Sequence, residues 1–64
     1  MSDILNHTEG GVCTLTFNRL GKKNSITAAM YSTLAEALRQ AQTDDAVRCV
    51  VFQGHETVFS AGND

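Results

Sequence analysis

The feature that most restricts the fold is a segment at 47–52 that is nearly apolar on both of its faces. Such a run is typical of a parallel strand, which is buried from two sides. A parallel neighbour is reached through a crossover connection, usually a helix. The preceding segment meets this requirement, because apolar residues recur there at the helical period and form one stripe of Met30, Leu34, Ala37, Leu38 and Ala41. We therefore predict a helix over 27–43, capped by Ser25 or Thr27.

A β-hairpin is predicted ahead of this helix. Residues 12–18 alternate between an apolar face and a face rich in threonine, which is the period of a strand. The apolar face carries Cys13, Leu15 and Phe17. The pair Gly10-Gly11 marks a turn, because glycine reaches positive φ without steric cost, and 4–9 form a weaker partner strand. Hairpin, helix and strand 47–52 together make an α/β unit, to which 58–60 could add a short strand.

The length of 64 residues allows one small domain or part of a larger one. A chain of this size buries only about 60% of the surface that its unfolded form exposes, so a core of its own is marginal. One helix and a hairpin cover a single layer, whereas the helix stripe and both faces of 47–52 need more cover. We therefore expect residues 1–64 to be a segment of a larger domain.

Charge and composition exclude several classes of function. Five Lys and Arg against seven Asp and Glu give a net charge of -2, so no surface for nucleic acid is expected. No apolar run approaches the roughly 20 residues of a membrane helix, and the N-terminus does not resemble a signal peptide. Cys13 and Cys49 lie inside apolar segments, which predicts buried thiols in a reducing cytoplasm, with a Cys13–Cys49 disulfide as the alternative.

The tail at 59–64 is the candidate for chemistry. Its small residues follow the predicted α/β unit, and ligand sites of parallel sheets lie outside the carboxyl ends of the strands. Small side chains let a ligand approach the backbone, whose N–H groups can hold a negative oxygen. An ordinary small-residue turn is the alternative that the local pattern leaves open. No metal site is expected, because His7 and His55 have neither ligand spacing nor a cysteine cluster nearby.

Three stretches occur in a characteristic order: 15–19 with 23–26, the helix 30–41 leading through 44–48 into 50–54, and the run VFSAGND at 58–64. Together they resemble the N-terminal part of the enoyl-CoA hydratase/isomerase family, also called the crotonase superfamily. The resemblance implies an α/β fold of ββα units wound into a spiral. The hairpin, helix 27–43, strand 47–52 and an active-site turn at 59–64 would be its N-terminal part, with the chain of 1–64 ending inside that oxyanion-hole turn.

The resemblance also implies an activity. Members of this family bind an acyl-CoA thioester and stabilise the enolate formed at its carbonyl. Asn63 matches the first oxyanion-hole donor, acting through its backbone N–H, and the second donor lies far beyond residue 64 in the family. Lys23 matches a position that contacts CoA. The lining of the CoA and acyl group is matched by Ser60, Ala61, Gly62, Asn63 and Asp64.

The family also sets expectations for cofactors and assembly. No metal or redox cofactor is implied, since coenzyme A enters as part of the substrate. Homotrimers or hexamers are typical of the full-length proteins. We expect the parent protein to act on a 2- or 3-enoyl-CoA in the cytoplasm.

Two departures from the family pattern limit what these residues can do. Leu20 stands where the family often has proline, so we expect the loop to be less rigid than in those members. The acid/base carboxylates of the family lie downstream, and Glu9, Glu36 and Glu56 match no catalytic position. We therefore expect the 64-residue chain alone to be inactive. The tail and the pair Lys22-Lys23 favour the Δ3,Δ2-enoyl-CoA isomerase branch of the family.

Two alternatives stay open at this point. Lys22 and Lys23 could meet the phosphates of CoA or could belong to a solvated loop. The chain could also be a non-catalytic CoA-binding or protein-interaction module.

Overall fold

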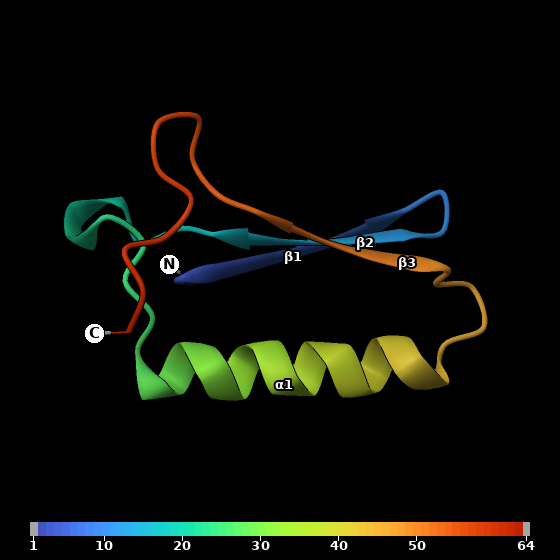
Figure 1. The fold of residues 1–64 in the computed structure, drawn as a ribbon. Coiled ribbons are helices and arrows are strands. Elements are labelled where there is room, and N and C mark those ends of the chain that lie inside the picture. Colours follow the sequence, from blue (N-terminus) through green and yellow to red (C-terminus); the bar gives the residue numbers. More distant parts are fainter. Residues whose placement is uncertain (1, 64) are drawn as a thin grey trace.

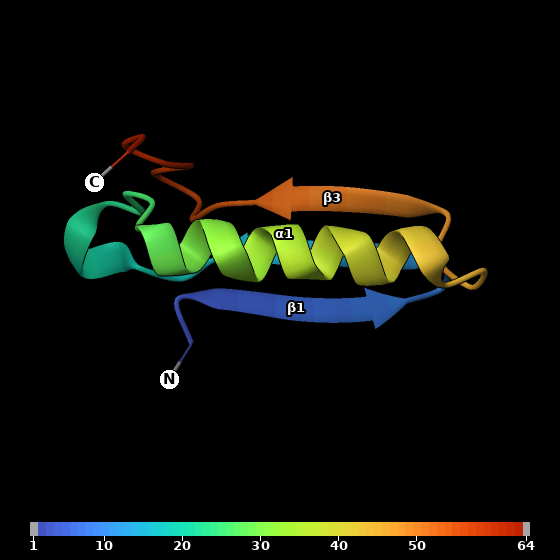
Figure 2. The same cartoon turned by 90° about the horizontal axis from the view of Figure 1, so that it is seen from below.

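The computed structural model describes residues 2–63, which form one three-stranded sheet and one long helix. The elements are β1 (Ile4–Glu9), β2 (Val12–Phe17), the short 3-10 helix η1 (Leu20–Lys22), α1 (Ala28–Thr43) and β3 (Cys49–Gln53). The strand order is β1-β2-β3, and α1 lies along one face of the sheet (Figure 1). From the helix side, α1 runs between the two outer strands (Figure 2). The predicted α/β order of hairpin, helix and parallel strand is confirmed.

β1 and β2 form the predicted antiparallel hairpin. Ile4 pairs with Phe17 at the open end of the hairpin. At the closed end, Gly10 and Gly11 have φ values of 59° and 82°, which the tight turn needs and glycine adopts without strain. β3 runs parallel to β2, as expected for a strand that is reached through a helix.

α1 begins after Thr27, one of the two predicted caps. The Met30 N–H donates to the Thr27 hydroxyl at 3.2 Å, and the Thr27 N–H donates to the Met30 thioether at 3.5 Å. This reciprocal pair satisfies N–H groups that find no acceptor within the first turn. At the other end, the Asp44 N–H donates to the Ala41 carbonyl at 3.3 Å. The predicted helix over 27–43 is therefore confirmed, with Thr27 as its cap.

The core lies between α1 and the sheet. Its buried side chains are Ile4, Cys13, Leu15, Phe17, Met30, Leu34 and Ala37. The predicted apolar face of β2 is thus the face that meets the helix. Of the predicted helix stripe, Met30, Leu34 and Ala37 are buried, whereas Leu38 is 41% exposed and Ala41 is half-buried.

β3 differs from the prediction in its position and its burial. It begins at Cys49 and not at residue 47. The Arg48 N–H donates to the Gly11 carbonyl at 2.7 Å, so the connection from α1 crosses the hairpin turn before the strand starts. Burial on both faces is not found, since Val50 is half-buried and the rest of β3 is exposed. The physical reason is that α1 covers one face of the sheet and β3 is an edge strand.

Both cysteines are free thiols. Cys13 is buried as predicted, and its Sγ lies 3.5 Å from the Asn6 Oδ1. The predicted burial of Cys49 is wrong, because Cys49 pairs with Val12 and shares the face of the sheet opposite α1. The two thiols thus point to opposite faces of the sheet, and the alternative of a disulfide is not realised.

The face of the sheet opposite α1 has no cover within residues 2–63. Leu5, Val12 and Val51 are exposed to 45%, 37% and 40% of their surface, and all three lie on this outer face by strand register. One helix over a three-stranded sheet leaves such an apolar face, as a single covering layer must. Within the described residues, no helix is long and apolar enough to cross a membrane.

Candidate active site

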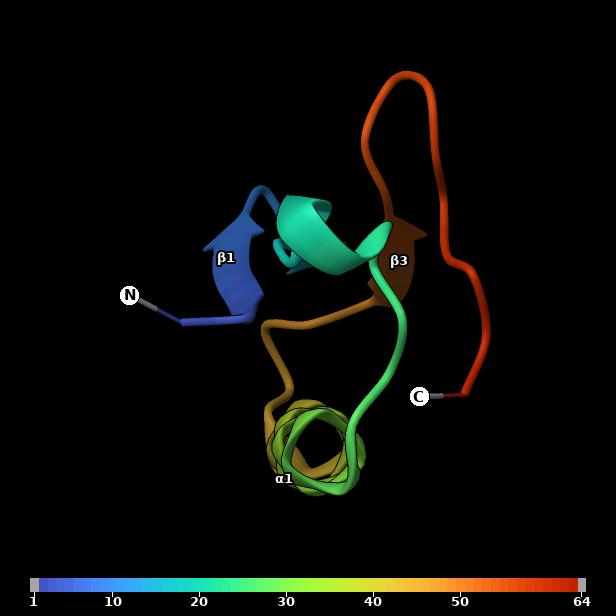
Figure 3. The same cartoon turned by 90° about the vertical axis from the view of Figure 1, so that its left-hand side faces the viewer.

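Two segments far apart in the sequence meet at one end of the sheet. The loop at 18–26 leaves the carboxyl end of β2, and the tail at 58–63 follows the carboxyl end of β3 (Figure 1). Both lie near the first turn of α1, and Figure 3 looks at this end of the molecule. It is the end of the sheet at which parallel α/β folds place their ligands.

The connection from β3 into the tail is a closed loop, and the short strand predicted at 58–60 is absent from it. The His55 N–H donates to the Val58 carbonyl at 2.7 Å, and the Val58 N–H donates to the His55 carbonyl at 3.3 Å. Because these groups are used inside the loop, they cannot join a neighbouring strand. The prediction of a short strand at 58–60 is therefore wrong, because hydrogen bonds inside the loop use the backbone groups of Val58.

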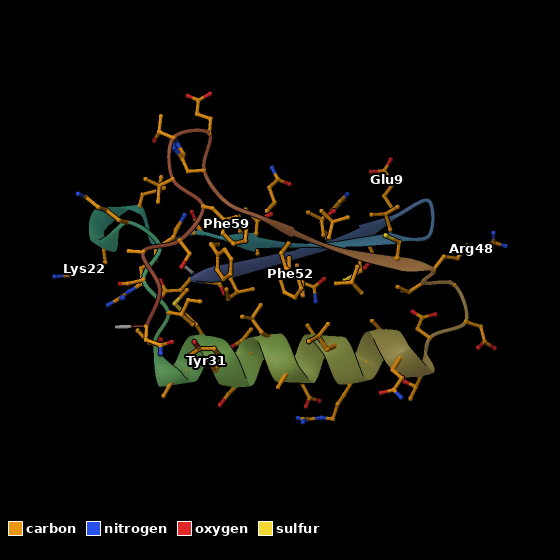
Figure 4. All side chains as sticks on the ribbon, in the orientation of Figure 1. Glu9, Lys22, Tyr31, Arg48, Phe52 and Phe59 are labelled. Carbon is orange, nitrogen blue, oxygen red and sulfur yellow. The ribbon has the colours of Figure 1, made fainter. Side chains whose placement is uncertain are left out.

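Phe59 fixes the start of the tail against the sheet. Its ring meets Phe17 of β2 edge to face, with ring centroids 5.2 Å apart and planes at 88°. Gly54 approaches so closely that a Cβ there would lie 2.8 Å from the Phe59 carbonyl oxygen. Figure 4 shows Phe59 at this end of the sheet, with Tyr31 of α1 below it in this view.

The tail is hydrogen-bonded along the end of the loop. The Ala61 N–H donates to the Lys23 carbonyl at 3.0 Å, and the Ile26 N–H donates to the Gly62 carbonyl at 2.8 Å. Ile26 and Asn63 form an isolated parallel bridge. The loop therefore determines where the backbone of 61–63 lies, although the two segments are more than 30 positions apart in sequence.

The amide groups at the end of the tail differ in what they bind. The Ala61 N–H is taken by the Lys23 carbonyl, and the Gly62 N–H donates to the Ser60 hydroxyl at 3.0 Å. The Asn63 N–H has no hydrogen-bond acceptor within residues 2–63. Gly62 has a φ of 92°, a conformation that glycine reaches without strain. Among residues 61–63, Asn63 is thus the one whose backbone N–H is open to a bound group.

The side chain of Asn63 is held by α1. Its Oδ1 accepts a hydrogen bond from the hydroxyl of Tyr31, a 49% exposed residue of the first turn. Figure 4 labels Tyr31 near the start of α1. Tyr31 lies outside the predicted apolar stripe of the helix, and sequence reasoning did not identify this contact. No local signal indicates it, because the two residues are 32 positions apart.

A second residue missed by sequence reasoning is Asn24, which is 0% exposed. Its Oδ1 accepts from the Arg19 N–H at 2.8 Å, and its Nδ2 donates to the Val58 carbonyl at 3.4 Å. Its own carbonyl accepts from the Ser60 hydroxyl at 2.8 Å. The one available signal is residue type, since asparagine is enriched among residues with positive φ, and Asn24 has a φ of 58°.

The predicted site residues are brought together by the contact of loop and tail. The exposed ones are Ala61, Gly62, Asn63 and Lys23, whose backbone carbonyl is bonded to the Ala61 N–H. Ser60 is half-buried and its hydroxyl is used inside the protein, on Asn24 and Gly62. Asp64, which belongs to the same prediction, lies outside the described residues.

Glu9, Glu36 and Glu56 have other partners or surroundings than residues 58–63. Glu9 pairs with His7 on the hairpin at 3.0 Å, and Glu36 pairs with Arg39 on the exposed face of α1. Glu56 is exposed in the loop after β3. None of them is bonded to the tail. Across the described positions, no group of three or more His, Cys, Asp or Glu side chains is placed to hold a metal ion.

The family described as enoyl-CoA hydratase/isomerase matches the chain over residues 7–64. The chain is 45% identical over 64 residues to the 1,2-epoxyphenylacetyl-CoA isomerase of Escherichia coli (strain K12), covering 100% of this chain and 24% of that protein. It is 49% identical over 61 residues to enoyl-CoA delta isomerase 2 of Rattus norvegicus, covering 95% of this chain and 15% of that protein. The chain thus spans less than a quarter of the length of either relative.

Solved structures match the fold over the same extent. OdaA of Pseudomonas aeruginosa superposes with a TM-score of 0.96 at 47% identity, covering 100% of this chain and 26% of that one. The enoyl-CoA hydratase of Mycobacterium tuberculosis H37Rv superposes with a TM-score of 0.93 at 36% identity, covering 98% of this chain and 28% of that one.

Proposed function

The chain belongs to the enoyl-CoA hydratase/isomerase family, and from that premise we propose that the protein carrying it acts on acyl-CoA thioesters as an enoyl-CoA hydratase or isomerase. The hairpin, α1 and β3 correspond to the N-terminal part of the crotonase fold. Since the relatives are several times longer, the proposal concerns the protein that contains residues 1–64 and not these residues alone.

The observation that carries the proposal is the unpaired N–H of Asn63. Removing a proton beside a thioester carbonyl places negative charge on the carbonyl oxygen. A donor that is fixed in advance stabilises this charge, which arises only as the transition state forms. The Asn63 N–H has no acceptor within residues 2–63 and follows two amides that are already occupied. We assign it the role of first oxyanion-hole donor, with the second supplied from outside this chain.

The surface around this amide suits a thioester and its CoA. Ala61 and Gly62 carry little or no side chain and are exposed beside Asn63, so a ligand can approach the backbone closely. Lys23 is exposed in the loop to which the tail is bonded, and we assign its ammonium group to a phosphate of CoA. Ser60 shapes the wall through its internal hydrogen bonds, and Asp64 completes the proposed lining.

Proton transfer is proposed to come from residues outside this chain. In the isomerase reaction, a base removes a proton from C2 of a 3-enoyl thioester and a proton is delivered at C4, so that the double bond moves to C2–C3. Glu9, Glu36 and Glu56 have no bond to the tail. We therefore propose that the 64-residue chain by itself does not turn over substrate. Identity to two isomerases favours isomerisation over hydration.

The setting of the reaction is proposed on the resemblance to the family. We place the protein in the cytoplasm, as a homotrimer or hexamer. Coenzyme A enters and leaves with the substrate, and no resident metal or redox cofactor is proposed.

A single ultraviolet assay of the protein carrying this chain tests the proposal. Conversion of a 3-enoyl-CoA to the conjugated 2-enoyl-CoA raises the absorbance of the conjugated thioester, whereas hydration of a 2-enoyl-CoA lowers it. We expect turnover with both substrates offered separately, and faster turnover of the 3-enoyl-CoA. Saturable binding of a CoA thioester without any turnover would instead support the non-catalytic module.

A further inference from the structure

We propose that Asn24 is a positioning residue, whose buried side chain sets the course of the tail and thereby the direction of the Asn63 N–H. The inference rests on the proposed function, because it concerns the donor that would face the thioester oxygen. Asn24 lies outside the exposed surface and would not itself touch substrate, since it is 0% exposed.

The orientation of the Asn24 amide follows from its partners. The Arg19 N–H can only donate, so the atom 2.8 Å from it is the Asn24 oxygen. The Val58 carbonyl can only accept, so the atom 3.4 Å from it is the Asn24 nitrogen. The two ends of one rigid amide therefore join the loop to the start of the tail. Reversing the amide would face donor to donor and acceptor to acceptor.

The backbone of Asn24 makes a second connection to the tail. Its carbonyl accepts from the Ser60 hydroxyl at 2.8 Å, and its N–H donates to the Arg19 carbonyl at 2.9 Å. The Ser60 hydroxyl in turn accepts from the Gly62 N–H at 3.0 Å. Side chain and backbone of Asn24 thus hold the tail at Val58 and at Ser60, and the chain of bonds ends one residue before Asn63.

Burial makes these bonds consequential. A buried polar side chain that lacks a hydrogen-bond partner destabilises the folded state, because no water takes the partner's place. The tail is therefore favoured where both ends of the Asn24 amide are bonded. Without the Asn24 side chain, the tail would keep the Phe59 ring contact and its backbone bonds to Lys23 and Ile26. Those contacts, with the Ser60 bond to the Asn24 carbonyl, retain the fold of this end, but the Val58 carbonyl loses its bond to the loop at 18–26.

The test is Asn24→Gly in the protein that carries this chain. Glycine keeps the φ of 58° without strain, so the variant removes the side-chain bonds and not the backbone conformation. The matched control is Asn18→Gly, which removes a side-chain bond of 3.0 Å from Asn18 Nδ2 to the Ser2 carbonyl, away from the tail. Asn24→Asp serves as a second variant, since it keeps the acceptor facing Arg19 and loses the donor facing Val58.

We expect Asn24→Gly to lower kcat for an enoyl-CoA by about tenfold to a hundredfold, with KM changed less than about threefold, because displacement of a donor weakens the transition state more than substrate binding. Amide hydrogen exchange at 60–63 should become faster, while exchange in α1 stays as in the Asn18→Gly control. Asn24→Asp should show the same split. An unchanged kcat, or a rise in KM alone, would overturn the proposal.

The two proposals can fail separately. If the unsubstituted protein turns over no enoyl-CoA, the proposed function fails, and hydrogen exchange at 60–63 still decides whether Asn24 sets the tail. If the unsubstituted protein is active and both Asn24 variants match it in kcat and exchange, the positioning role fails and the proposed function stands.

Discussion

Gly54 is the glycine at which packing leaves least room for a side chain. A Cβ there would lie 2.8 Å from the Phe59 carbonyl oxygen and 2.9 Å from the Val58 carbonyl oxygen. Both neighbours are backbone atoms, which cannot turn aside as the end of a flexible side chain can. We expect Gly54→Ala to lower the free energy of unfolding by about 1–3 kcal/mol, measured by urea denaturation.

Gly21→Ala is the matched control for that substitution. A Cβ on Gly21 meets nothing within 4 Å, and its φ does not lie in the left-handed region. Its free energy of unfolding should stay within about 0.5 kcal/mol of the unsubstituted protein. Equal losses for the two variants would show that the close approach of Gly54 to the tail is not what matters.

Thr27 gives a second prediction at this scale. Its hydroxyl accepts the Met30 N–H at 3.2 Å and so caps the start of α1, close to the bridge between Ile26 and the tail. Thr27→Ala should lower the free energy of unfolding by about 1 kcal/mol. Thr27→Ser keeps the acceptor, so its free energy of unfolding should lie within about 0.3 kcal/mol of the unsubstituted protein's. Thermal denaturation of both variants measures the difference. A loss as large in Thr27→Ser would point to the missing methyl group instead of the cap.

What the sequence predicts about single residues depends on how far away their partners lie. The cap Thr27 is recognised because it contacts a residue three positions away. Asn24 and Tyr31 are not recognised, because their tail partners are 34 and 32 positions away. The predicted lining of Lys23 and 60–64 comes from the family resemblance, whereas local pattern alone favours an ordinary small-residue turn.

Among the elements, α1 provides the clearest contrast between buried and exposed positions. Leu34 is 8% exposed and packs into the core, so Leu34→Ala removes apolar contact and leaves a cavity. We expect a loss of about 2–5 kcal/mol in the free energy of unfolding. Glu36→Ala, on the exposed face, breaks a surface pair with Arg39 and should change that free energy by less than about 1 kcal/mol. Urea denaturation of both variants, compared at equal slope, decides whether the predicted stripe is the stabilising face.

The accuracy of prediction for the elements follows from the kind of signal. The helix and hairpin are confirmed because their periodicity reports directly on the face that is buried. The start of β3 was placed two residues early, because apolar Val47 continues the pattern while Arg48 is bonded to the hairpin turn. The strand predicted at 58–60 failed for a similar reason, since a local loop uses the backbone groups of Val58.

At the scale of the molecule, the site is built from two layers of support. The sheet end and the first turn of α1 bring loop and tail together (Figures 1 and 3). Hydrogen bonds to Lys23 and Ser60 then occupy the amides of Ala61 and Gly62, whereas the Asn63 N–H has no acceptor within residues 2–63. The sequence predicts the first layer through strand order and helix period. Local pattern does not predict the second, because the choice among Ala61, Gly62 and Asn63 as open donor depends on bonds that only the folded chain forms, and Asn63 was expected through the family resemblance alone.

The outer face of the sheet leads to a prediction for the whole molecule. Cys49 lies on this face and is exposed, whereas Cys13 is buried under α1. In the 64-residue chain, we expect a thiol reagent to modify Cys49 rapidly and Cys13 only as the hairpin and helix separate. In the longer protein, a further layer over the apolar outer face should slow the modification of Cys49 as well, because burying apolar surface away from water is favourable.

Mass spectrometry of timed labelling measures both rates, and Cys13→Ser and Cys49→Ser assign them. Rapid labelling of both thiols in the 64-residue chain would show that one helix over one sheet does not hold together without more of the protein. Rapid labelling of Cys49 in the longer protein would show that its outer face stays open, and would contradict the second layer. Slow labelling of Cys49 in the longer protein, with rapid labelling in the 64-residue chain, would show that the rest of the protein covers the outer face and completes this marginal core. The proposed oxyanion hole also requires the rest of the protein, because this segment supplies one of its two donors.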